Sequence, residues 1–346
     1  MSPPRSPHPA PAPRAIARWL FAVAALVFIM VIVGGITRLT ESGLSMVRWE
    51  PISGAVPPLN EAQWQAEFAA YKSSPEYQKV NSGMALGDFK QIFFWEYLHR
   101  LIGRLIGLAF AVPLAWFAWK RAIPRGYGWR LTALLALGGM QGAIGWWMVA
   151  SGLIDRPDVS HIRLAIHLIA ALFIFSGLIW TALDLRLLAR DPGAPSARLT
   201  GGAIGAIAVL AVQILLGAFT AGLDAGYAFS SWPKMGDAWF PAGGWHSGWS
   251  VIANLADNPV VVQFVHRWWA WAAAAALLSL AWAAHKAQLK GLGHAVATLV
   301  IVQIALGIAT LLTGVDLVVA VAHQAVAALL LASVVWAAHG LGRPAR

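Results

Sequence analysis

Four histidines that lie inside apolar segments are the residues of this chain best suited to chemistry. They are His99, His167, His266 and His323. Each follows the start of its hydrophobic stretch by about seven or eight residues, which puts each imidazole about 11 Å below one membrane boundary if the stretch is a helix. Ionisable groups at such depth are costly and usually functional. Because neutral imidazole is a common axial ligand of haem iron, we predict two iron-binding pairs, His99 with His167 and His266 with His323.

The surroundings of the two pairs differ at one residue. Glu96 lies three residues before His99 and therefore shares a helix face with it, whereas the matching position before His266 is Gln263. A carboxylate in an apolar span is costly unless it is paired or protonated. This asymmetry predicts that one haem reacts while the other transfers electrons. The alternative is that Glu96 forms a structural ion pair with Arg100, one turn along the helix.

Arginines accompany the histidines in both halves of the chain. Those near the first pair are Arg100, Arg104 and Arg163, and Arg267 follows His266. A guanidinium is suited to the propionate carboxylates of a haem, so we predict that the first three contact a haem there. Snorkelling of these side chains toward lipid headgroups is an alternative of equal weight, except for the deeper Arg104.

The other histidines serve as a contrast. Five of them are expected in a tail, an outer loop or the inner ends of helices, where ordinary solvation suffices: His8, His246, His285, His294 and His339. His161 lies at a helix entrance, six residues before His167, and is compatible either with a propionate contact or with no role at the site.

The composition identifies the elements that must position these residues. The chain has 346 residues, of which 59% are hydrophobic and 12% charged, which points to an all-α polytopic membrane protein. Eight stretches are long enough to span a bilayer. We expect them near 17–38, 91–119, 129–151, 160–185, 200–222, 259–284, 292–313 and 316–340.

Landmarks repeat in the same order in two halves. His-Arg, then Gln followed by small residues, then a lone histidine occur once in each half, and a further run of this kind begins at Gln213. Small residues at this spacing are also typical of close helix packing alone. The repeat predicts eight transmembrane helices in two pseudo-symmetric four-helix bundles. The boundaries we expect are a disordered cytoplasmic tail at 1–16, an N-terminal half at 17–189, a linker at 190–199, a C-terminal half at 200–340 and a cytoplasmic tail at 341–346.

Lysine and arginine gather at both ends of the chain and in one set of connections, whereas the longer opposite loops hold few of them. The positive-inside rule therefore predicts a multi-pass protein of a bacterial inner membrane, with both termini cytoplasmic. The formal charge of +10 reflects this topology, and no basic stripe interleaved with aromatics indicates nucleic-acid binding. Because the chain has no cysteine, thiolate metal sites and disulfides are excluded.

Several motifs, in order along the chain, resemble those of the haem A synthases of bacteria and mitochondria. The matching segments are residues 34–45 with Trp49 and Pro51, Phe89-Lys90, 96–104, Gln141-Gly142, 148–152, 163–167, 221–226, 232–235, 263–267 and His323-Gln324. One branch of that family carries paired cysteines in its outer loops, and this chain resembles the cysteine-free branch. The resemblance covers nearly the whole chain after the tail.

The resemblance implies oxidation of the methyl group of haem O to the formyl group of haem A for cytochrome oxidase assembly. It also implies a haem b held by His266 and His323, a substrate haem near His99 and His167, and Glu96 as the catalytic acid–base residue. A haem O synthase is then an expected partner. Monomer and homo-oligomer are both compatible with the sequence.

Two other functions use the same histidines. A dihaem b-type electron-transfer protein exchanging electrons with quinone would use all four but leaves Glu96 unexplained. A transporter or haem-delivery chaperone would use the repeat without chemistry. The electron acceptor or donor and the source of the formyl oxygen are not indicated by the sequence.

Overall fold

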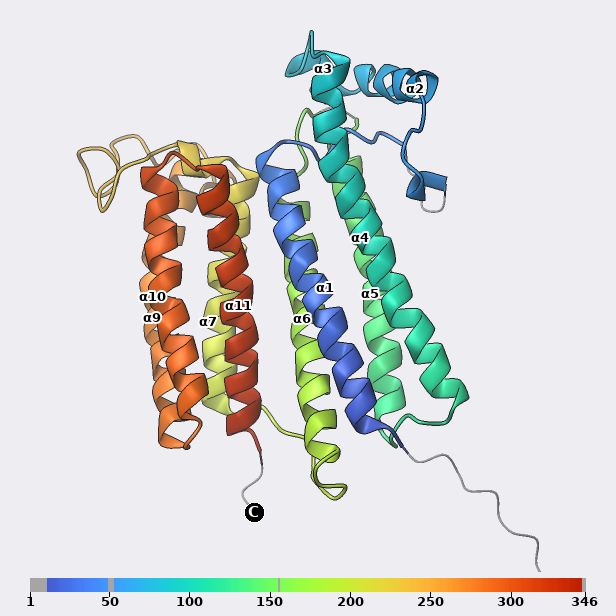
Figure 1. The fold of residues 1–346 in the computed structure, drawn as a ribbon. Helices are drawn as coiled ribbons and strands as arrows, with labels where there is room; N and C mark the ends of the chain where they lie inside the picture. Colours follow the sequence, from blue (N-terminus) through green and yellow to red (C-terminus); the bar gives the residue numbers. More distant parts are fainter. Residues whose placement is uncertain (1–10, 49–52, 155, 344–346) are drawn as a thin grey trace, which may run out of the picture.

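The computed structural model describes residues 11–48, 53–154 and 156–343, and every regular element in these ranges is helical apart from one bridge between Met235 and Ala238. Eight long helices run roughly side by side (Figure 1). They are α1 (Pro13–Leu39), α4 (Leu86–Trp119), α5 (Tyr127–Ala150), α6 (His161–Leu188), α7 (Gly201–Gly222), α9 (Pro259–Lys286), α10 (Lys290–Leu312) and α11 (Leu317–Leu341). Short elements cap one end: η1 (Ser53–Ala55), α2 (Glu61–Lys72), α3 (Pro75–Lys79), η2 (Ala225–Tyr227) and α8 (Val251–Asp257).

Seven of the described helices are long and apolar enough to cross a membrane, which confirms a multi-pass membrane protein. The exception among the eight is α9, which has 28 residues but is rich in alanine and tryptophan rather than in leucine, isoleucine and valine. The expected span at 259–284 therefore forms a helix, and its crossing of the membrane stays a prediction.

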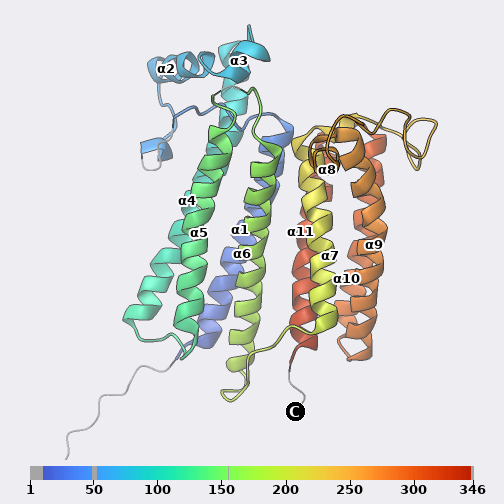
Figure 2. The same ribbon diagram turned by 180° about the vertical axis from the view of Figure 1, so that it is seen from behind.

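The helices lie in two groups (Figures 1 and 2). One group is α1, α4, α5 and α6, and the other is α7, α9, α10 and α11. The groups meet where α6 packs against α7 and where α11 packs against α1 and α6. Buried aliphatic side chains from both groups form one continuous core at this junction.

Two predicted boundaries were wrong. The tail expected at 1–16 ends earlier, because α1 begins at Pro13, whose fixed φ suits the first turn of a helix; residues 1–10 lie outside the described ranges, as do Trp49 and Pro51. The second span begins at Leu86 rather than near 91. The extra residues carry α4 above the neighbouring helices, where α2 and α3 lie (Figure 1).

An aromatic cluster joins this extension to the outer loop. Phe68 and Tyr71 of α2 pack on Phe89 of α4, with ring centroids 5.0 and 5.2 Å apart. Trp64 packs edge-on against Phe93 at 5.1 Å. Buried rings therefore form the core of an aromatic cap above the first group of helices.

The opposite end holds a buried charge network. Asp184 of α6 is 2% exposed and contacts Arg130 of α5 at 2.6 Å and His339 of α11 at 2.9 Å. It also accepts a hydrogen bond from the backbone N–H of Ala197 in the connection between α6 and α7. The expectation that His339 is ordinarily solvated was wrong: its ring is fully buried against this carboxylate and beside Trp180. The network therefore ties both groups of helices and their linker together.

Candidate functional site

Each of the four histidines faces a glycine on a neighbouring helix. The pairs are Gly34 of α1 with His99 of α4, Gly145 of α5 with His167 of α6, Gly217 of α7 with His266 of α9, and Gly307 of α10 with His323 of α11. A Cβ added at these glycines would lie 3.0 to 3.3 Å from the nearest imidazole atom. A larger residue would therefore press on the ring, so the glycines make room for the imidazoles.

The structure brings His99 within electrostatic range of His167, and His266 within range of His323. That each pair binds one iron stays a prediction. In the described part of the chain, no group of three or more His, Asp or Glu side chains could hold a bare metal ion. Two imidazoles per site fit an iron whose other ligands come from a macrocycle. We call each of these four glycines the cradle of the imidazole that it faces. The cradles suit haem ligation, because each one leaves room for a planar ring at a fixed place.

The position along the helix differs from the expectation for one histidine. His167, His266 and His323 lie six or seven residues after their helices begin at His161, Pro259 and Leu317. His99 lies thirteen residues after Leu86, because α4 starts in the cap rather than at the level of the other helix ends.

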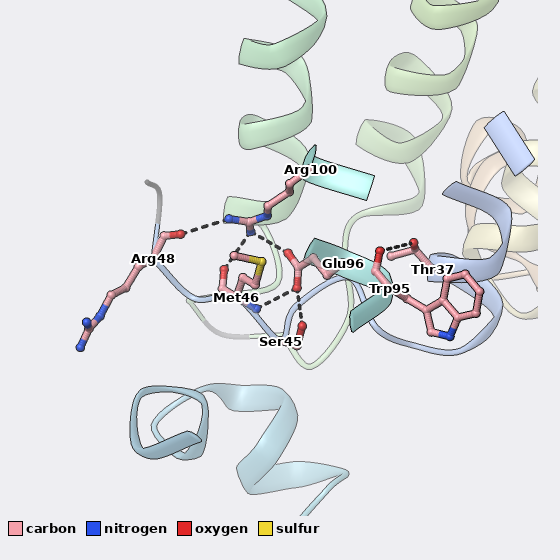
Figure 3. Close-up of polar contacts among 7 residues, drawn as sticks. All are labelled: Thr37, Ser45, Met46, Arg48, Trp95, Glu96 and Arg100. Carbon is pink, nitrogen blue, oxygen red and sulfur yellow. Dashed lines mark hydrogen bonds and ion pairs between the residues drawn. The ribbon is translucent and has the colours of Figure 1, made fainter. Parts of the chain in front are cut away.

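Glu96 is at the centre of a buried polar network (Figure 3). Its side chain is 3% exposed. One oxygen, Oε2, accepts hydrogen bonds from the Ser45 hydroxyl and the Met46 backbone N–H, both at 2.7 Å. The other, Oε1, lies 2.6 Å from Nη2 of Arg100. The ion pair considered as the alternative role of Glu96 is thus present.

Arg100 continues the network into the loop after α1. Its guanidinium donates to the carbonyl oxygens of Met46 and Arg48, at 2.8 and 3.1 Å (Figure 3). Beside it, the Thr37 hydroxyl reaches the carbonyl oxygens of Val33 and Trp95. The bonds of Arg100 hold the loop that follows α1 against the outer part of α4, and Thr37 joins α1 itself to α4.

Gln263 and Arg267 form the corresponding contacts in the second group. Gln263 is 1% exposed and accepts a hydrogen bond from Arg267 at 3.1 Å. Its amide donates to the carbonyl oxygens of Gly226 and Phe229, and Arg267 donates to those of Phe229 and Ser231. A neutral amide therefore holds this loop by donating to carbonyl oxygens, whereas Glu96 holds the other by accepting from Ser45 and Met46. Loop anchoring as such does not require a carboxylate charge.

The remaining predicted residues lie around the first pair. Arg163 donates to the carbonyl oxygen of Trp147 at 2.7 Å and stacks its guanidinium over that ring at 4.6 Å. Arg104 is half-buried on α4, four residues beyond Arg100. The buried His161 has its Nε2 3.1 Å from Asp257 of α8 and packs edge-on against Phe219. It thus connects the two groups of helices. The propionate contacts considered for Arg104, Arg163 and His161 stay predictions.

Sequence reasoning missed one set of functional candidates. Gln141, Gln213 and Gln303 each lie against the imidazole that faces the glycine four residues later. The sequence signal for these glutamines is a Gln-x-x-x-Gly pattern, which is also typical of close helix packing through small residues. The Asp184–His339 contact had no local signal, because its partners are 155 residues apart.

Known proteins resemble this chain over almost its whole length. The family model described as "Cytochrome oxidase assembly protein" matches residues 17–335. A protein of Rhizorhabdus wittichii named "Heme A synthase" is 65% identical, with 98% of each chain covered. Proteins of the same name from Sphingopyxis alaskensis and Novosphingobium aromaticivorans are 59% and 49% identical; the matches cover 98% and 97% of this chain and 96% and 99% of theirs.

Proposed function

The chain belongs to the cytochrome oxidase assembly protein family, and from this we propose that it is a haem A synthase. It oxidises the methyl group of haem O to the formyl group of haem A, in successive steps through the alcohol. The name of its full-length relatives and the two histidine pairs support this function. The observation that carries it is the buried carboxylate of Glu96 next to one pair only.

The two sites take different haems in this proposal. His266 and His323 hold a resident haem b, which supplies one-electron redox chemistry when bound. His99 and His167 bind the substrate haem. The glycine cradles beside all four imidazoles support haem at both sites, and Gln263 in place of a carboxylate supports the non-reacting role of the second. The arrangement as two pseudo-symmetric four-helix bundles, with α9 as an eighth span, is part of the proposal.

Glu96 is the acid–base residue near the reacting porphyrin edge. A carboxylate can take up a proton as the methyl group is oxidised, either directly or through a water molecule. Ser45, Met46 and Arg100 hold its two oxygens in place, which fixes the orientation of the carboxylate. Arg104 and Arg163 are proposed to bind propionates, with Arg100 contributing there as well as to the loop.

The cellular setting follows from the same proposal. The named relatives are bacterial, and the connections at the end of the molecule where α1 begins and α11 ends are rich in arginine. We place that end in the cytoplasm and the chain in the inner membrane. A haem O synthase supplies the substrate.

The test is haem extraction from a bacterium that makes haem O but no haem A and that carries this chain. Haem A is expected in the extract, and haem b together with haem O or haem A is expected in the purified protein. A purified protein with haem b alone, at two per chain, would instead support the dihaem electron-transfer protein. Haem O bound but never converted would support a carrier.

A further inference from the structure

Three of the four imidazoles lie against a glutamine of the neighbouring helix. In each case the glutamine precedes the cradle glycine by four residues, one helical turn away on the same face. The motifs are Gln141-x-x-x-Gly145 in α5, Gln213-x-x-x-Gly217 in α7 and Gln303-x-x-x-Gly307 in α10.

The contacts are similar in the first two motifs. Nε2 of Gln141 lies 3.1 Å from Nδ1 of His167 and donates to the carbonyl oxygen of that histidine at 2.9 Å. Nε2 of Gln213 lies 3.2 Å from Nδ1 of His266 and donates to its carbonyl oxygen, also at 3.2 Å. Each glutamine therefore contacts both the ring and the backbone of its histidine.

The third motif repeats the ring contact, with Nε2 of Gln303 3.2 Å from Nδ1 of His323. All three glutamines also share an unsatisfied atom. Their amide oxygens Oε1 are buried and have no hydrogen-bond partner. A buried acceptor without a donor costs free energy, so three such atoms at equivalent positions indicate a shared missing donor.

Iron ligation supplies that donor. An imidazole that binds iron through one nitrogen carries a proton on the other, and that N–H is almost always donated to an acceptor. A glutamine amide presents either its NH₂ group or its oxygen after rotation of the side chain. When Nε2 of the histidine binds iron, a rotated glutamine amide can accept from Nδ1–H through Oε1. In the first two motifs this rotation exchanges the bond from Nε2 to the histidine carbonyl oxygen for the bond from Nδ1–H.

The fourth imidazole lacks this partner. Met30 precedes Gly34 by four residues and so occupies the glutamine position opposite His99. Its methyl carbon lies 3.1 Å from where a Cβ on Gly103 would be, so its side chain packs on α4 one turn beyond His99. A thioether is only a weak acceptor. The side-chain hydrogen bonds of the described residues reach the other three imidazoles and not that of His99.

We infer that Gln141, Gln213 and Gln303 are positioning residues that hold three haem ligands by accepting Nδ1–H, and that Met30 leaves His99 as the exchangeable ligand of the substrate haem. The inference rests on the proposed function, because it takes the first site to bind a substrate and the second a resident haem. A resident haem is retained more tightly when a glutamine orients both of its histidine ligands. A substrate haem must enter the site and its product must leave. One histidine oriented by a glutamine, His167, and one without such a partner, His99, meet that need.

The first experiment replaces Met30. Met30→Gln gives His99 the missing acceptor, and Met30→Leu is the control of similar shape without one. We expect haem A to leave the Met30→Gln protein about tenfold more slowly, since such outer contacts change metal affinity by about 10–100-fold. The measurement is transfer of haem A from purified protein to a haem-scavenging protein. Equal release rates for the two variants would overturn the role of Met30.

The second experiment replaces Gln303. Gln303→Met should weaken retention of haem b by about 10–100-fold and raise its reduction potential, because the ligand donates less to iron. Gln303→Glu keeps an acceptor and should keep haem b, which separates a lost hydrogen bond from a folding defect. Unchanged retention and potential in Gln303→Met would overturn the positioning role. A wild-type protein with neither haem b nor haem A formation would refute the proposed function instead.

Discussion

The two groups of helices anchor equivalent loops through opposite hydrogen bonds: Glu96 accepts from Ser45 and Met46, whereas Gln263 donates to carbonyl oxygens. In the first, Glu96 and Arg100 hold the loop after α1, and in the second Gln263 and Arg267 hold the loop after α7. Both acidic and amide side chains are almost fully buried. Because an amide anchors the second loop without the cost of a buried charge, we propose that the carboxylate of Glu96 serves chemistry in addition to its ion pair with Arg100.

The largest expected difference between the groups concerns haem b. His323→Ala should abolish the haem b signal of the purified protein, because one imidazole alone remains at that site, whereas His167→Ala should leave the signal in place. Reduced-minus-oxidised absorption spectra and haem extraction measure both. A haem b signal that survives in His323→Ala and disappears in His167→Ala would reverse the assignment of the two sites.

A second difference concerns Glu96. Glu96→Gln should lower haem A formation by about 100-fold or more, in line with loss of a general acid–base group, and should leave the haem b spectrum unchanged. The fold should persist because Gln263 shows that an amide fits such a network. Glu67→Gln removes a partly exposed carboxylate near the same loop and is the matched control. Full haem A production by Glu96→Gln would refute the catalytic assignment.

The glycine cradles provide a finer comparison. Gly307→Ala places a Cβ 3.0 Å from His323 Cε1. Overpacking of this kind costs about 1–3 kcal/mol, so haem b should dissociate about tenfold more readily. Gly205→Ala on α7 meets nothing within 4 Å and should behave as wild type. Haem loss to a scavenging protein measures the effect, and equal loss from the two variants would show that the cradle is not needed.

The smallest expected effect is confined to the cap of the first group. Glu76 of α3 is buried and bonded to the Tyr71 hydroxyl at 3.0 Å, and burial raises the pKa of its carboxyl from 4.5 to about 8. Burial also raises the pKa of Tyr71. Between pH 4.5 and about 8 the folded cap keeps a proton on Glu76 that the unfolded cap loses, so cap stability falls as pH rises through this window.

Hydrogen exchange of residues 61–79, corrected for the intrinsic pH dependence of exchange, measures this effect. Glu76→Gln should make protection independent of pH over the window, while Glu61→Gln, at a more exposed position on α2, should retain the dependence. Protection in the wild type that rises from pH 5 to pH 8 would contradict the expected sign.

The long helices were predictable because apolar runs of the required length have few other solutions in a membrane. The histidines were predictable because ionisable residues stand out in such runs. The loop partners of Glu96 were not predictable, unlike Arg100 on the same helix. Ser45 and Met46 are about 50 residues away from Glu96 and are brought to it only by the path of the loop. The same holds for the early start of α4 at Leu86, which depends on aromatic packing against α2 rather than on hydropathy.

The network around Asp184 has a consequence for the order in which the chain is synthesised. Asp184 and Arg130 are made before His339, which belongs to α11, the last helix among the described residues. The buried carboxylate therefore gains its second side-chain partner only after α11 has been made. The same helix brings His323, the last of the four histidines. A chain that stops before α11 lacks both His323 and His339. The addition of this one helix therefore completes the contact with Asp184 and the second pair of imidazoles.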